Sequence, residues 1–123
     1  MTNRNIEREQ IVISKEEDIK LTNKGFKQDG NKPIVGDLLK VFSKTLMAVG
    51  DCMTLNAKNH PEPDDWKNLD NAQRRLTNAM IRHLLKYLGG TELDEEDNLP
   101  HLVHVAWNAL AICELYLDSK NKE

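Results

Sequence analysis

The sequence predicts an all-α protein with three main helices and a polar N-terminal arm, and three observations lead to this fold class. Apolar side chains recur at the helical period in three segments. Turn formers with proline or glycine separate these segments. No segment shows the strict alternation of a half-buried strand. Because 123 residues suffice for one domain with a modest core, we expect a helical domain over residues 33–119.

The segments on either side of this domain are polar. Residues 1–32 are rich in Lys, Glu, Asp, Asn and Gln and contain few large apolar side chains. Such a composition buries too little apolar surface to order a chain by itself. We therefore expect a flexible arm over residues 1–32, with a short segment that could order on a partner, and a disordered tail over residues 120–123.

The first expected helix opens at Pro33, because proline is tolerated in a first helical turn. Its apolar residues form one stripe and should face the core: Val35, Leu38, Leu39, Phe42, Leu46, Val49 and Met53. A loop over residues 56–69, marked by Pro61 and Pro63, should follow it.

The second expected helix runs from about Asp70 to Leu88, where Gly89 and Gly90 supply a left-handed cap. The acidic loop TELDEEDN comes next, and Pro100 starts the third helix. The third helix is apolar on nearly every side, and two neighbouring helices cannot easily cover it. We therefore expect a second copy of the chain to complete the bundle, most simply as a two-fold dimer.

Three polar residues interrupt the apolar third helix. His101, His104 and Asn108 follow the spacing i, i+3 and i+7, which places them on one side. His83 lies in the apolar stripe of the second helix. If the two helices pack antiparallel, His83 approaches the start of the third helix. The histidines then face a shared pocket, or else each merely bonds to a backbone carbonyl inside the core.

A basic row lies beside the stripe of the second helix. Arg75, Asn78, Arg82 and Lys86 share one face. Arginines close to a helix N-terminus favour an anion, above all a phosphate. The alternative is an exposed face whose charges pair with neighbouring acids.

The acidic loop supplies carboxylates beside the imidazoles. Such a set suits Mg²⁺, Mn²⁺ or Zn²⁺, depending on the number of ligands. The residues that we expect to bind a metal are Asp94, His101 and His104, with His83 as a base or a further ligand. An acidic loop that is simply solvated is the alternative.

Composition narrows the other classes of function. A net charge of −3 and an isoelectric point of about 5.8 give no general nucleic-acid-binding surface. No apolar run reaches the length of a membrane span and no signal peptide is evident, so we expect a cytoplasmic protein. Cys52 and Cys113 lie in apolar helical surroundings and should be reduced core residues. The common signatures of zinc proteases, P-loop proteins and serine hydrolases are absent.

The order of these residues resembles a phage-associated family, the dATP/dGTP diphosphohydrolase N-terminal domain. The resemblance covers about Lys27 to Leu117. It includes FKQDGNKP, DLL, Gly50, Trp66, RHLLKYLGG, Asp94 with Glu96, and PHLVHVAWNAL. The blocks around His83 and around His101 and His104, separated by glycine and an acidic loop, are its most specific part.

The resemblance implies cleavage of a purine deoxynucleoside triphosphate to the monophosphate and pyrophosphate, as in all-α MazG-like enzymes that use Mg²⁺. His83 and Asp94 would then be catalytic, with Mg²⁺ or Mn²⁺ as cofactor. If the chain instead binds a nucleotide without turnover, Trp66 or Tyr87 would stack the base, and Lys27 or Lys32 could close over the phosphates. The expected ligand-binding residues are Lys27, Lys32, Trp66, Arg75, Arg82, His83, His101, His104 and Asn108.

Two other functions stay open. The chain could be a phage sponge that binds and sequesters a signalling nucleotide of host defence, a cyclic nucleotide or an ADP-ribose type, in the cytoplasm of the infected bacterium. It could instead be a helical protein–protein interaction module with no small ligand. A nucleotide or another phosphate compound is thus the expected partner in two of the three cases.

Overall fold

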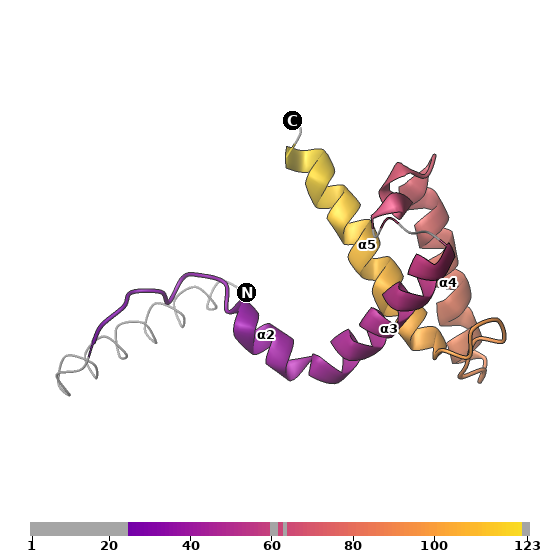
Figure 1. The fold of residues 1–123 in the computed structure, drawn as a ribbon, viewed down its shortest axis with the longest axis horizontal. Coiled ribbons are helices and arrows are strands. Elements are labelled where there is room, and N and C mark those ends of the chain that lie inside the picture. The colour runs from indigo at the N-terminus through magenta and orange to yellow at the C-terminus, as the bar shows by residue number, and fades with distance from the viewer. Residues whose placement is uncertain (1–24, 60–61, 63, 122–123) are drawn as a thin grey trace. The chain divides into compact units, whose positions relative to one another are not determined.

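The computed structural model describes residues 25–59, 62 and 64–121. Within these residues the chain forms four α-helices, one short 3₁₀ helix and no strand, so the all-α prediction is confirmed (Figure 1). The helices are α2 (Val35–Val41), α3 (Ser43–Asn59), η1 (Asp65–Asn68), α4 (Ala72–Leu88) and α5 (His101–Asn121).

The chain divides into two compact units, Met1–Lys40 and Val41–Glu123. Most of the expected arm and half of the expected tail lie outside the described residues, and the described residues 120 and 121 belong to α5. Lys27 and Lys32 belong to the first unit, and their proposed contact with phosphates stays a prediction.

The prediction of one continuous first helix is wrong, because Phe42 separates α2 from α3. The stripe of this segment also contributes less to the core than expected. Val35, Leu38, Leu39 and Phe42 are each more than half exposed, whereas Val49 is buried. Helices in proteins persist mainly through tertiary packing. Since none of the residues of α2 is buried, packing does not enforce helical continuity across Phe42.

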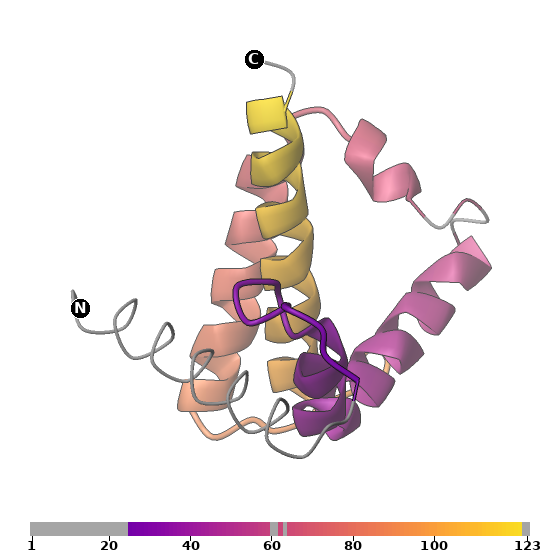
Figure 2. The same cartoon turned by 90° about the vertical axis from the view of Figure 1, so that its left-hand side faces the viewer.

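The second unit is built on the pairing of α4 with α5. The two helices lie side by side in both views and are joined at one end by the loop from Gly89 to Pro100, so they run antiparallel, the arrangement under which His83 is expected to approach the third helix (Figures 1 and 2). Helix α3 packs against α5. Val49 and Cys52 of α3 and Val103 of α5 form a small core, joined by the partly buried Ala48, Leu99, Ala106 and Trp107.

The loop between α4 and α5 is held by backbone hydrogen bonds. Gly90 adopts a φ of 98°, the left-handed conformation that ends a helix, and the Thr91 N–H donates to the Lys86 carbonyl. At the other end, the Asp94 N–H donates to the Leu99 carbonyl and the His101 N–H to the Glu92 carbonyl, at 2.7 and 2.9 Å. This loop is therefore a folded element rather than a solvated acidic tract.

None of the helices in the described part of the chain is both long and apolar enough to cross a membrane. Helix α5 nevertheless keeps an apolar side open. Leu102, Leu110, Tyr116 and Leu117 lie within about 120° of one another around the helix, and each is about half exposed.

Candidate metal centre

Three imidazoles gather where α4 meets the start of α5. The Nδ1 atoms of His83 and His101 lie 2.8 Å apart. The rings of His83 and His104 are stacked, with centroids 4.3 Å apart and an interplanar angle of 12°. Antiparallel packing thus brings together three histidines that are separated by up to 21 positions in the sequence. We refer to His83, His101 and His104 as the histidine cluster.

Two carboxylates of the loop face the histidine cluster. Asp94 is buried, and its Oδ1 accepts a hydrogen bond from the Glu96 N–H at 2.8 Å. Its Oδ2 lies 3.5 Å from Nε2 of His104 and 3.8 Å from Nδ1 of His83. Asp97 is arranged in the same way. Its Oδ1 accepts from the Leu99 N–H, and its Oδ2 lies 2.7 Å from His104 Nε2. One oxygen of each carboxylate fixes the loop, and the other points to the imidazoles.

The ligand atoms of these five residues form two overlapping groups. His83, Asp94 and His101 make one group, and Asp94, Asp97 and His104 make the other; within each group the atoms lie within 4.8 Å of one another. Asp94 is common to both. The expected set of Asp94, His101 and His104 is therefore divided between the groups, and Asp97 is an addition that the sequence analysis missed.

The donor set fits a divalent cation. Among the described residues, Nε2 of both His101 and His104 is buried without an aligned hydrogen bond, even though Asp97 Oδ2 is close to His104. A buried polar atom that lacks a partner costs free energy, and a cation would satisfy such lone pairs. Imidazole nitrogen mixed with carboxylate oxygen suits Mn²⁺, Zn²⁺ or Fe²⁺ better than Mg²⁺, which prefers oxygen alone.

The pKa values of His83 and Asp94 favour the protonation states in which these residues bind a cation. Burial and the neighbouring His104 lower the pKa of His83, with a further small contribution from Arg82. Burial opposes ionisation of Asp94, but the hydrogen bond from Glu96 N–H and the charges of the three imidazoles outweigh it and lower the pKa of Asp94. Near neutral pH, His83 is thus uncharged and Asp94 is ionised, the forms in which both residues coordinate metals.

Cys52 approaches the centre from α3. Its Sγ lies 3.6 Å from Nδ1 of His104, on the far side of the ring from the carboxylates. Burial, followed by the charge of Asp97, raises the pKa of Cys52 to about 11, so the thiol stays protonated. If His104 donates its Nδ1 proton to this sulfur, its Nε2 lone pair is left free for a cation.

Apart from Lys27 and Lys32, the remaining expected ligand residues belong to the second unit but not to the histidine cluster. Arg82 is exposed beside His83. Asn108 is 5% exposed and donates from Nδ2 to the His104 carbonyl at 2.7 Å, a hydrogen bond within its own helix. Arg75 and Trp66 line a separate cavity, and Tyr87 is 41% exposed near the end of α4.

The fold and this site define an all-α chain with a partly buried histidine–aspartate centre. The comparison with protein families then gives a match to dATP/dGTP diphosphohydrolase, N-terminal, over residues 22–123. The match spans most of the chain, so the chain belongs to this family, as the sequence motifs predicted. The name of the family points to hydrolysis of purine deoxynucleoside triphosphates. Searches of curated proteins and of solved structures found no match.

We predict that the centre binds Mn²⁺ and that Asp94→Asn weakens this binding at least about tenfold, because Asp94 is common to both groups. Asparagine keeps an oxygen that can accept from the Glu96 N–H, so the loop should persist. Glu95→Gln is the matched control, since Glu95 is exposed in the same loop. Isothermal titration calorimetry measures both affinities, and equal affinity of Asp94→Asn and wild type would contradict the assignment.

The metal-free protein should lose stability as pH falls below about 6.5, the ordinary pKa of histidine. The pKa of His83 is lower in the folded protein, so the unfolded chain takes up more protons in this window. Asp94 adds to the loss only at lower pH, below its ordinary pKa of 3.8. Urea unfolding at pH 7.5, 6.5 and 5.5 with a chelator measures the slope. His83→Asn should make it shallower, and an unchanged slope would count against the lowered pKa.

Proposed function

We propose that the chain hydrolyses a purine deoxynucleoside triphosphate to the monophosphate and pyrophosphate in a metal-dependent reaction at the histidine cluster. The observation that carries this proposal is the convergence of three imidazoles and two carboxylates in two overlapping, partly buried groups that share Asp94. Membership of the dATP/dGTP diphosphohydrolase family supports the choice of substrate.

The residues of the centre divide into holding and proton-transfer roles. Asp94, Asp97, His101 and His104 would hold the cation. When bound, a divalent cation neutralises phosphate charge and polarises the bond that breaks. His83 is the candidate base, because its side chain is 19% exposed, compared with 13% for His104, and because its lowered pKa leaves it neutral.

The proposed reaction balances with water as the second substrate. Water loses a proton to His83 as its oxygen forms a bond to the α-phosphorus. The bond from the α-phosphorus to the bridging oxygen breaks, and pyrophosphate leaves with that electron pair. Arg82, exposed one position before His83, would hold phosphate oxygens of the leaving group.

A nucleotide sponge without turnover is the second candidate function, and one observation favours it. Helix α4 carries no Asp or Glu, and the acids of α5, Glu114 and Asp118, lie far along that helix from the histidine cluster. The carboxylates of the centre therefore come from the loop, whereas MazG-like enzymes draw them from paired helical motifs. A phage protein of this kind would sequester a signalling nucleotide of host defence in the cytoplasm.

We further infer that the chain assembles as a homo-oligomer, because the open side of α5 is apolar. Leu102, Leu110, Tyr116 and Leu117 stay about half exposed there. An apolar stripe of this kind on one helix is most simply covered by the same stripe of a second copy across a two-fold axis.

We predict hydrolysis of dATP and dGTP to the monophosphates and pyrophosphate in the presence of Mn²⁺, with a loss of at least about 100-fold for Asp94→Asn. The reason is that removing a charged ligand leaves the cation loosely held. Glu95→Gln should retain wild-type activity. Chromatography of the nucleotide products measures the rate. Tight binding of a nucleotide without any product would support the sponge instead, and neither binding nor product would support the interaction module.

Leu110→Glu should convert the oligomer to monomers, because a charge at the centre of the apolar side of α5 would be buried without a partner. Met47→Glu on α3, where the side chain is 74% exposed, is the matched control and should leave assembly unchanged. Light scattering coupled to size-exclusion chromatography gives the mass of each. A wild-type protein that elutes as a monomer at high concentration would refute this inference.

A further inference from the structure

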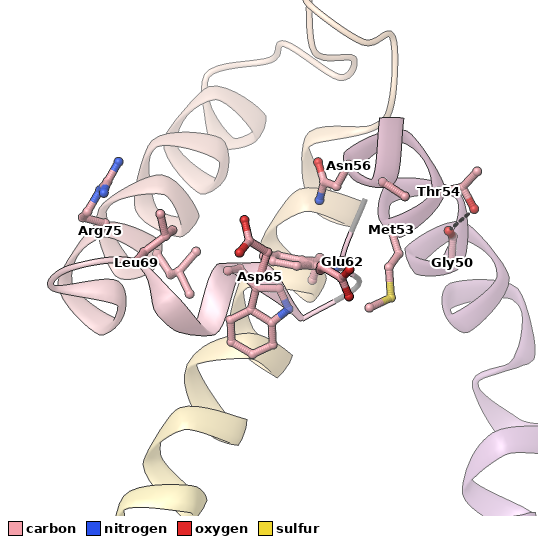
Figure 3. Close-up of a pocket in the computed structure, with 12 residues that line it drawn as sticks. Gly50, Met53, Thr54, Asn56, Glu62, Asp65, Leu69 and Arg75 are labelled. Carbon is pink, nitrogen blue, oxygen red and sulfur yellow. Dashed lines mark hydrogen bonds between the residues drawn. The ribbon is translucent and has the colours of Figure 1, made fainter. Parts of the chain in front are cut away.

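The second unit contains a cavity of about 580 Å³ that the metal centre does not use. Residues of α3, η1, α4 and α5 line it. Figure 3 shows Met53 and Asn56 on one side and Leu69 and Arg75 on the other. We call it the tryptophan cavity, because Trp66 and Trp107, the only tryptophans of the chain, both line it. Its volume lies in the range of about 300–1,000 Å³ that small-molecule sites occupy.

The walls of the tryptophan cavity suit a flat aromatic ring. Trp66 and Trp107 meet edge to face, with centroids 5.6 Å apart, and Leu69 and Leu76 add apolar surface. Aromatic side chains bind nucleobases by stacking, and every base offers a face for this contact. Nε1 of Trp66 is buried, and among the described residues it has no hydrogen-bond partner. It is a donor that could meet a ring nitrogen of a bound base after a small side-chain adjustment.

The polar lining also selects for a base rather than a phosphate. Asn56 offers an amide, whose donor and acceptor match the edge of a purine. Among the described lining residues, Arg75 supplies the positive charge and Glu62 adds a carboxylate, so the lining lacks the cluster of cations that a triphosphate requires.

Helices α3 and α5 each carry residues of both the cavity and the metal centre. Trp107 follows His104 by three residues, about 4.5 Å along α5. Met53 directly follows Cys52, whose sulfur contacts His104. A ligand with its ring in the cavity could therefore extend along α5 to the histidine cluster over a short distance, as a sugar does between a base and its phosphates.

We propose that the tryptophan cavity is the subsite for the purine base of the deoxynucleotide. The inference rests on the proposed function for the identity of the phosphate site, but it makes a separate claim. The cavity should bind a purine deoxynucleoside that carries no phosphate, without a metal ion and without any reaction.

Gly50→Leu is the sharpest test, because it fills the cavity without disturbing the helix. A Cβ added at Gly50 meets no atom within 4 Å, and leucine has a higher helix propensity than glycine. Gly36→Leu is the matched control. Its Cβ also meets nothing within 4 Å, it too lies in a helix, and it does not line the cavity.

The experiment titrates deoxyguanosine, deoxyadenosine and deoxycytidine into each protein with a chelator present. Tryptophan fluorescence and calorimetry report binding, since both tryptophans line the cavity. Wild type and Gly36→Leu should bind both purines, deoxycytidine should bind at least tenfold more weakly, and Gly50→Leu should lose at least tenfold in purine affinity. Absence of purine binding to wild type, equal binding of deoxycytidine, or unchanged affinity of Gly50→Leu would each overturn the proposal.

Two additions keep the outcome decisive. If circular dichroism shows that Gly50→Leu does not fold, Asn56→Leu takes its place with the same expected loss, since Asn56 is exposed on α3. Asp94→Asn should bind purine deoxynucleosides like wild type, because the metal centre is a different site. Wild type that binds purine deoxynucleosides but does not hydrolyse dATP or dGTP would contradict only the proposed reaction. The assignment of the base subsite would still hold.

Discussion

The antiparallel pairing of α4 with α5 is the constraint on which the rest of the site depends. His83 is near the end of α4, and His101 and His104 are in the first turn of α5. Their rings meet only because the loop between them turns the chain back within a dozen residues. A different helical register, shifted by a single turn of about 5.4 Å, would separate His83 from both partners. The loop hydrogen bonds that fix this register therefore also fix the site.

The loop has a second role, because the residues that shape it also supply charge to the centre. Asp94 and Asp97 each use one carboxylate oxygen to bind a backbone N–H two positions ahead, at 2.8 and 3.0 Å. This geometry is the turn that aspartate forms most readily. It leaves the second oxygen of each residue facing the imidazoles. The hydrogen bonds that fold the loop therefore also orient the two carboxylates toward the imidazoles.

The two parts of the proposed nucleotide site follow from the two packing contacts of α5. The contact with α4 creates the histidine cluster, and the contact with α3 places Cys52 behind His104 and leaves the tryptophan cavity beside it. Three positions of α5 separate His104 from Trp107, so a single helix carries a residue of each part. A ligand with a charged end and a flat aromatic end, such as a nucleotide, would match these two parts: the charged end at the histidine cluster and the aromatic end in the tryptophan cavity.

The sequence by itself determined the all-α class, the end of the second helix at Leu88 and the polar side of α5. These features depend on neighbours within one helix, where the 3.6-residue period fixes which side chains share a face. It also indicated His83 near the start of the third helix, because a short loop leaves few ways to pair two helices. The family followed from the same blocks of residues.

Only the tertiary structure decided that Asp97 and Cys52 join the centre, that Trp66 and Trp107 share a cavity, and that the first helix divides at Phe42. These features depend on how α3 crosses α5 and on which apolar stripe has a partner to pack against. Local periodicity contains no information on either, because a stripe of Val, Leu and Phe looks the same whether or not another helix covers it.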